Sequence, residues 1–212
     1  LLLGSYFETG WDSWIDGGSD ATRTNNSANA WEGLYSIRLT DNSGTQSAMT
    51  SPVFNLSNAT GLEIEFYFKA VSMETGEDFW IQYKNGSGAW TTIGQAIAGT
   101  HFNNNTFYVA TQTVPGFVPT TAGSLRIQCD ASDDSDKIFV DAVKITKFTG
   151  PALIKEGLQI KTILELPDAP VDTISSNEIA EPTVYPNPVN DVLHIAFEGD
   201  IQSIRMMSID GI

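Results

Sequence analysis

The sequence predicts an all-β fold, a jelly-roll β-sandwich of two antiparallel sheets, followed by a linker and the start of a second small β unit. Between residues 35 and 145, short runs of alternating apolar and polar residues are separated by turn residues. No segment shows a convincing helical period. Of the 212 residues, 41% are hydrophobic and only 17% are charged, which indicates a globular chain rather than a disordered one.

Eight runs carry this alternation, and their order suits a jelly roll. In "LEIEFYFKA", Leu62, Ile64, Phe66 and Phe68 share one face of a strand. Alternate members of a jelly roll belong to opposite sheets, and the two inner faces pack on each other. We therefore expect one sheet to contain 46–54, 78–85, 90–97 and 124–131, and the other 35–40, 62–70, 107–114 and 138–145.

The ends of the chain differ in character from this middle part. The early segment "YFETGWDSW" is expected to lie along an edge and to return to the last strand. After Gly150, several prolines and an acidic, polar second half indicate a linker, whose first part is apolar enough to pack back onto the sandwich. We therefore divide the chain into a sandwich over 1–149, a linker over 150–181 and a third segment over 182–212.

The third segment opens with "VYPNPVNDVLHIAF", in which two prolines hold the chain extended before an alternating strand. The residues "YPNPVNDVLHI" resemble the start of the C-terminal sorting domain of the type IX secretion system, with Tyr185, Pro186, Asn187 and Pro188 in the family's order. The resemblance covers a truncated sorting domain. It implies the type IX secretion machinery as a partner, and a protein secreted from, or placed on the cell surface of, a Gram-negative bacterium. The alternative is an ordinary second β domain.

Charge and hydropathy exclude two classes of partner. A net charge of −15 would repel nucleic acid and anionic membranes, and no Lys/Arg stripe reverses it locally. No apolar run approaches the roughly 20 residues of a membrane helix, so no membrane insertion is expected. The start lacks Met and the end stops inside a hydrophobic pattern. We therefore expect a fragment cut at both ends, so that a signal peptide could have been removed with the missing part.

The residues that could support catalysis are few and scattered. His101 and His194 have no partner at ligand spacing, which argues against a catalytic zinc ion or a serine-protease triad. Glu63 and Glu65 share a strand face about 7 Å apart, but such pairs are usually solvated. We therefore expect this fragment not to be an enzyme. Cys129 alternates with apolar residues and is expected to be buried.

The acidic run "DASDDSD" (130–136) superficially has the look of a calcium loop. It lacks the central Gly and the terminal bidentate Glu of a helix–loop–helix site. The interpretation we favour is a solvated acidic turn.

Three motifs resemble those of family 4/16-type carbohydrate-binding modules, which are jelly rolls with a structural calcium ion. "GSYFETGWDSW", "AWEGLYSIRL" and "KIFVDAVKI" match the opening, third-strand and closing motifs in that order. The resemblance implies calcium ligands at Glu8, Glu32 and Asp141, with backbone carbonyls of Tyr6 and Tyr35. An acid at an inward or edge position is costly unless paired, and calcium suits a set of oxygen donors. The alternative is that the carboxylates separately cap turns.

The sheet expected to bind ligand carries a candidate binding face. Alternation points Trp80 and Gln82 outward from one strand, and Arg126 and Gln128 outward from its neighbour. Aromatic rings stack on sugar C–H faces, while amide and guanidinium groups pair with hydroxyls. Alternatively, a loop covers Trp80, and Arg126 pairs with Asp78 or Asp130.

Together these features predict a non-catalytic, monomeric carbohydrate-binding module that is an accessory part of a secreted multidomain protein. Its partner would be a polysaccharide or surface glycan. The middle of the chain leaves a second hypothesis open. "SAMTSPVFNL" followed by "LEIEFYFKA" is also similar to the adhesive jelly roll of MAM-type modules. That resemblance implies an adhesion or protein–protein interaction module attached to a secreted peptidase or other hydrolase.

Overall fold

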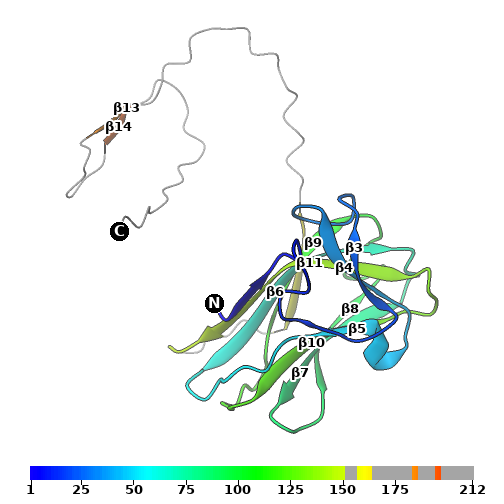
Figure 1. Ribbon diagram of the computed structural model, residues 1–212, viewed down its shortest axis with the longest axis horizontal. Coiled ribbons are helices and arrows are strands. Elements are labelled where there is room, and N and C mark those ends of the chain that lie inside the picture. The colour runs from blue at the N-terminus through cyan, green and yellow to red at the C-terminus, as the bar shows by residue number, and fades with distance from the viewer. Residues whose placement is uncertain (151–156, 164–182, 186–193, 197–212) are drawn as a thin grey trace. The chain divides into compact units, whose positions relative to one another are not determined.

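The structure, a computed structural model, describes residues 1–150, 157–163, 183–185 and 194–196 (Figure 1). The chain divides into two compact units, Leu1–Leu164 and Glu165–Ile212. The first unit is a sandwich of two sheets in which every pair of neighbouring strands is antiparallel. The predicted all-β jelly-roll fold is confirmed.

The two sheets differ in size. The larger one contains, in spatial order, β12 (Leu158–Thr162), β9 (Phe107–Thr113), β6 (Gly61–Val71), β11 (Lys137–Phe148), β4 (Tyr35–Thr40) and β3 (Ala21–Asn25), with β1 (Leu3–Ser5) also paired to β11. The smaller one contains β2 (Ile15–Asp16), β5 (Ala48–Thr50), β10 (Gly123–Asp130), β7 (Asp78–Asn85) and β8 (Thr91–Ile97). All eight predicted runs lie in the sheet expected for them.

The predicted run 46–54 forms only a short strand. A 3₁₀ turn over Gly44–Ser47 precedes β5, which spans three residues. The edge segment 6–14 connects β1 to β2, and β1 rather than that segment pairs with the last strand, with Leu3 opposite Ile145. The strands β1 and β2 escape prediction because two or three residues cannot display an alternation.

One strand comes from the range expected to be a linker. β12 pairs with β9 over five residues, and Leu158 and Ile160 pack against the core. The first part of this range thus packs back onto the sandwich, as predicted, and belongs to the compact unit Leu1–Leu164. The physical reason is that β12 alternates apolar and polar residues and satisfies the free backbone groups of an edge strand.

The core lies between the two sheets and is rich in aromatic side chains. The alternating residues Leu62, Ile64, Phe66 and Phe68 of β6 are fully buried, as predicted. Phe68 packs edge-on against Phe79 of β7, with ring centroids 4.9 Å apart. Such aromatic contacts add to the burial of large apolar areas, so this layer holds the two sheets together.

Cys129 of β10 belongs to the same core. Its side chain is buried and its thiol is free, as predicted. Burial raises the pKa of the Cys129 thiol to about 12. The side chain therefore acts as a small apolar group.

In the second unit the structure describes one pair of short strands. β13 (Thr183–Tyr185) pairs antiparallel with β14 (His194–Ala196), with Tyr185 opposite His194. The predicted residues Pro186, Asn187 and Pro188 lie outside the described residues. No helix in the described part of the chain has the length and apolarity needed to cross a membrane.

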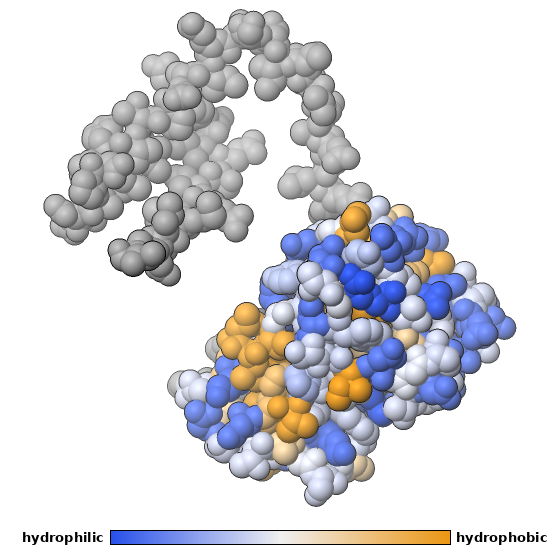
Figure 2. Space-filling model, in the orientation of Figure 1, coloured by the Kyte–Doolittle hydropathy of each residue, from blue (hydrophilic) through white to orange (hydrophobic). Residues whose placement is uncertain are grey.

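Figure 2 shows one side of the surface of the sandwich. On the face shown in Figure 2, hydrophilic side chains predominate and apolar residues gather near the N-terminus. The exposed large hydrophobic residues of the described part are scattered through the sequence: Leu1, Tyr6, Ile15, Leu34, Val53 and Val118.

Candidate functional site: the outer face of the smaller sheet

The four predicted binding residues lie on two adjacent strands, β7 and β10. In the antiparallel register Arg126 lies opposite Gln82 and Gln128 lies opposite Trp80. The residues between them on β10, such as Ile127, point into the core. The four side chains therefore share the outer face of the five-stranded sheet. We call this surface the five-stranded face.

A chain of hydrogen bonds crosses this face. The Arg126 Nε donates to Gln82 Oε1 at 2.7 Å, and the Gln82 Nε2 donates to Thr92 Oγ1 on β8 at 3.1 Å. Gln82 and Gln128 are only 6% and 5% exposed. Burial also lowers the pKa of Arg126 below its usual value. The amide and guanidinium groups are thus held in fixed orientations by neighbouring side chains.

A second tryptophan, Trp90, joins the face. The Arg126 Cζ lies 4.5 Å from the centroid of the Trp90 ring, and the Lys84 Nζ lies 5.9 Å from it. Both distances fit cation–π contacts. Sequence reasoning missed Trp90, which stands just before β8. In the β7–β8 hairpin, the pairing of Tyr83 with Thr91 places the preceding tryptophan beside Lys84, a register that the alternation within either strand does not reveal.

The expected alternative for Arg126, an ion pair with Asp78 or Asp130, is not what the structure shows. Asp78 instead accepts a hydrogen bond from the Gln95 amide. Asp130 lies directly opposite Asp78, and burial together with the charge of Asp78 raises the pKa of Asp130. Trp80 is partly exposed beside this acidic end of the sheet.

The predicted calcium ligand Asp141 lies at a bulge in β11. The register with β6 shifts between Asp141 and Lys144, and Ala142 adopts a left-handed backbone conformation with φ of 45°. Asp141 Oδ2 accepts hydrogen bonds from the backbone N–H groups of Trp31 and Glu32 at 2.8 and 2.9 Å, and its Oδ1 accepts one from Ala142 at 2.7 Å. The carboxylate therefore anchors the start of the turn over residues 31–35.

Asp141 is 1% exposed, and the main cause of its altered acidity is burial. Desolvation raises the pKa of Asp141 from 3.8 to about 6, and the charge of Glu8 contributes in the same direction. The three backbone hydrogen bonds act in the opposite sense. Ionised Asp141 is thus costly even with its donors in place.

Glu8 anchors the other end of the same turn. Its Oε1 accepts hydrogen bonds from the backbone N–H groups of Leu34 and Tyr35 at 3.0 and 2.9 Å. Gly33, with φ of 67°, leaves room for this approach, because a Cβ there would come within 2.4 Å of the Glu8 carboxylate. Glu8 and Asp141 therefore both hold the 31–35 turn through its backbone.

The Glu32 side chain and the carbonyls of Tyr6 and Tyr35 complete the predicted donor set, and the contacts described for the two tyrosines involve the Tyr6 N–H and the Tyr35 ring rather than these carbonyls. The Glu32 side chain is exposed. The Tyr6 backbone N–H donates to Asp12 at 2.8 Å, and the Tyr35 ring lies under the Arg23 guanidinium at 3.5 Å. Arg23 also donates to the carbonyls of Phe7 and Glu8.

The predicted donor set fits a calcium ion only in part. Glu8 and Asp141 come close enough for their charges to interact. Among the residues that the structure describes, however, the carboxylates of Glu8, Glu32 and Asp141 do not gather within the reach of one ion. The one acidic group that does so there consists of Glu74, Glu77 and Asp136.

The residues weighed for catalysis lie in structural roles. His101 Nδ1 accepts a hydrogen bond from the Ile97 backbone N–H at 2.9 Å, within the turn after β8. Glu65 forms an ion pair with Lys144 at 3.4 Å on the outer face of the larger sheet. Glu63 shares that face and lies opposite Thr146.

Comparison with solved structures defines the class of fold. The chain is similar to the CBM22-1 xylan-binding domain of Xyn10C from Paenibacillus barcinonensis, with 18% identity and a TM-score of 0.50 over 71% of this chain and 96% of that one. It is also similar to the CBM22-1–GH10 modules of xylanase 10B from Clostridium thermocellum, with 17% identity and a TM-score of 0.51 over 72% of this chain and 29% of that one. The first unit thus has the jelly-roll fold of carbohydrate-binding modules, as the sequence motifs implied.

The second unit is defined by its sequence. Residues 183–212 match the family described as the secretion system C-terminal sorting domain. A search of curated proteins finds no match to this chain. The chain therefore joins a jelly roll of the carbohydrate-binding-module type to a secretion sorting domain.

Proposed function

We propose that residues 1–164 are a non-catalytic carbohydrate-binding module, an accessory part of a secreted multidomain protein. The observation that carries the proposal is the five-stranded face, where Arg126, Gln82 and Thr92 form a hydrogen-bonded chain beside Trp80 and Trp90. The ligand would be a polysaccharide or surface glycan.

The residue types on this face suit a sugar. An indole ring offers a flat apolar surface to the C–H face of a pyranose, and amide and guanidinium groups both meet hydroxyls. Because the polar groups are already oriented by one another, ligand binding would require little ordering of side chains. The fold likeness to a xylan-binding domain makes xylan the first polysaccharide to test.

The direct test is retention on insoluble xylan together with a glycan array. We expect Trp80→Ala to abolish retention while the melting temperature stays within a few degrees, since a stacking contact at a surface is worth about 1 kcal/mol or more. Val118→Ala, which shortens an exposed apolar side chain in a loop, is the control. Absence of retention on every glycan, with and without calcium, would favour the MAM-like adhesion module instead.

Export is the second part of the proposal. The sorting domain supports type IX secretion to the medium or the cell surface of a Gram-negative bacterium, as part of a larger protein that we infer to be a hydrolase. A passenger fused to the complete sorting domain should reach the surface of a type IX-competent host. Retention of that passenger in the periplasm would contradict this assignment.

Structural calcium at Tyr6, Glu8, Glu32, Tyr35 and Asp141 remains a proposal. The desolvated Asp141 carboxylate beside Glu8 supports it, because a cation would relieve their repulsion. Calcium that binds the native chain alone would stabilise it by about 2.7 kcal/mol at a hundredfold excess over the dissociation constant. A melting temperature that is the same in chelator and in millimolar calcium, for wild type and Asp141→Ala alike, would contradict the proposal of this calcium site.

A further inference from the structure

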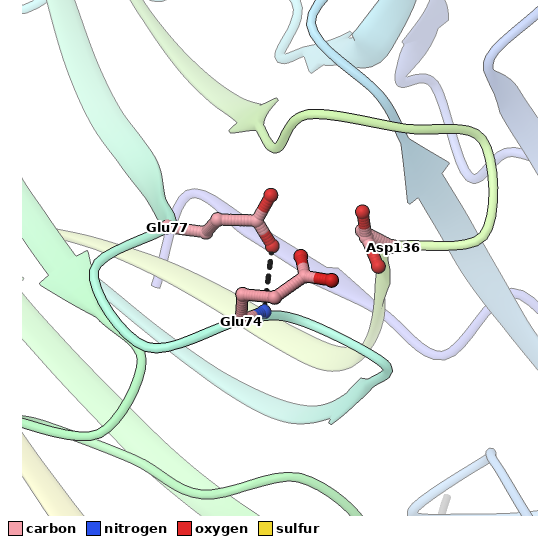
Figure 3. Close-up of side chains that lie close together, drawn as sticks. All are labelled: Glu74, Glu77 and Asp136. Atoms are coloured by element: carbon pink, nitrogen blue, oxygen red, sulfur yellow. Dashed lines mark hydrogen bonds between the residues drawn. The ribbon is translucent and has the colours of Figure 1, made fainter.

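Two loops that cross between the sheets bring three carboxylates together at one place. Glu74 and Glu77 lie in the β6–β7 connection, and Asp136 ends the β10–β11 connection. Each offers an oxygen within 4.8 Å of the others. Figure 3 shows the Asp136 side chain directed toward the two glutamates, which are joined by a hydrogen bond from the Glu74 backbone N–H to the Glu77 carboxylate.

Asp136 is the unusual member of this group. It is 1% exposed, and its Oδ2 accepts no hydrogen bond from any residue that the structure describes. Its Oδ1 has only a long contact of 3.5 Å with Ser135 Oγ. A buried carboxylate oxygen without a donor is costly and rare, so it calls for a partner. The sequence suggested a solvated turn here, and Asp133 and Asp134 are indeed exposed, but Asp136 is not.

Glu77 is fixed in place between the loops. Its Oε1 accepts a hydrogen bond from the Ser132 backbone N–H at 2.7 Å, and its Oε2 accepts one from the Glu74 N–H at 2.7 Å. The group is therefore built from an anchored carboxylate, a buried one and the exposed carboxylate of Glu74.

The charges of the group are not balanced by a basic residue. Within the described part of the chain, no Lys or Arg nitrogen comes within 4.0 Å of any of the three carboxylates. Burial and the charge of Glu77 raise the pKa of Asp136, and a hydrogen bond with Glu77 and the charge of Asp136 raise that of Glu74. The charge of Lys137 acts in the opposite direction on Asp136, and hydrogen bonds from Ser132 and Glu74 lower the pKa of Glu77 although its burial acts to raise it.

We propose that Glu74, Glu77 and Asp136 bind a calcium ion that clamps the two crossover loops together. Oxygens that bind one calcium ion at about 2.4 Å lie no more than about 4.8 Å apart, which matches the group. Carboxylate donors without His or Cys favour calcium over zinc. Two of the three carboxylates, those of Glu74 and Glu77, also line a pocket that is open to solvent.

This site is distinct from the one proposed at Glu8 and Asp141. Asp136 and Asp141 are five residues apart along an extended segment, which separates them by about 16 Å. Variants can therefore test the two sites independently.

Calorimetric titration of calcium into the chelator-treated full chain tests the proposal. We expect a dissociation constant of about 10⁻⁴–10⁻³ M, which is typical of calcium sites in extracellular modules. Glu74→Gln, which changes an exposed side chain, should weaken this binding at least tenfold, and Asp136→Asn should abolish it. Asp134→Asn removes the same charge from the same loop and should bind as wild type does. Asp141→Asn should leave this binding event in place.

Thermal melting provides a second readout. In chelator, Asp136→Asn should melt at or above the wild-type temperature, because it removes a buried unpaired charge. In millimolar calcium the wild type should gain stability that Asp136→Asn and Glu74→Gln do not. Calcium binding and calcium-dependent melting that are both the same in wild type, Glu74→Gln and Asp136→Asn would overturn the proposal.

Discussion

The outer faces of the two sheets use similar side chains in different ways. On the larger sheet, a loop over residues 26–34 lies across the outer face. Trp31 of this loop stacks on Tyr67 with ring centroids 4.6 Å apart, and Phe107 meets Trp31 edge-on at 5.5 Å. The Lys69 Nζ donates to the Ala28 carbonyl of the same loop at 2.8 Å.

On the smaller sheet, the polar groups of the outer face bond to one another. Arg126 and Gln82 are joined side chain to side chain, and Trp90 packs against the guanidinium. On the larger sheet, by contrast, the carboxylates of Asp141 and Glu8 accept hydrogen bonds from backbone N–H groups of the covering loop. The comparison shows that a loop of the same chain covers part of the outer face of the larger sheet, whereas on the smaller sheet the polar side chains bond to one another.

The largest expected effect is at the outer face of the larger sheet, where the loop over residues 26–34 covers Asp141. It is the pH dependence of folding stability that Asp141 causes. In chelator, its pKa of about 6 in the folded chain lies above the ordinary 3.8, so the folded state holds the proton more tightly than the unfolded state. The stability that protonated Asp141 contributes is complete below about pH 4 and is lost as the pH rises through about 6. At 1.36 kcal/mol per pKa unit, the loss approaches about 3 kcal/mol.

Urea denaturation of wild type and Asp141→Asn between pH 4 and 7.5 measures this difference. We expect the variant to lack this part of the wild-type decline. Parallel curves for the two proteins would mean that Asp141 is well solvated, and that the loop it holds is open to water.

The second test compares alanine substitutions of two tryptophans, one on the outer face of each sheet. Trp31→Ala should destabilise the chain by about 2–3 kcal/mol, because it removes stacking on Tyr67 and Phe107, and it should leave glycan retention unchanged. Trp80→Ala should do the reverse, with loss of retention and a change in stability below about 1 kcal/mol. Denaturant midpoints and retention of both variants are compared side by side. An unfolded Trp80→Ala would show that Trp80 belongs to the core.

The sequence could predict the sandwich because the central strands carry long alternations. Phe66, Phe68, Ile127 and the other inward residues follow a period of two, so both strand identity and sheet membership could be predicted. The strands β1 and β2 could not, because they span two or three residues and are set by pairing with β11 and β5, which lie much later in the sequence.

The sites show the same limit. The positions of Trp80 and Arg126 follow from alternation within a strand, whereas Trp90 and Trp31 lie outside strands and act through contacts made only in the folded chain. The burial of Asp136 was equally out of reach. It depends on contact between the β6–β7 and β10–β11 connections, which are about 60 residues apart in the sequence. No local sequence pattern predicts that contact.

The third test concerns the orientation of the guanidinium on the five-stranded face. Arg126→Lys keeps the charge but removes the Nε donor to Gln82 and the planar contact with Trp90. We expect retention on the polysaccharide to fall about tenfold and stability to change by about 1 kcal/mol or less. Lys84→Arg, a matched exchange next to the same ring, should change neither. Full retention by Arg126→Lys would show that only a positive charge is needed there.

The smallest expected effect lies at the ion pair between Lys144 and Glu65, on the face of the larger sheet. Their side chains are 44% and 35% exposed and 3.4 Å apart, so water and salt screen the attraction. A double-mutant cycle with Glu65→Gln and Lys144→Gln should give a coupling energy of about 0.5 kcal/mol or less, falling further in high salt. A coupling above about 1 kcal/mol that resists salt would mean that the pair is shielded from solvent. The loop over residues 26–34 would then shield more of the outer face of the larger sheet than the area around Trp31. The two outer faces would differ more in solvent access than the exposed fractions of these side chains indicate.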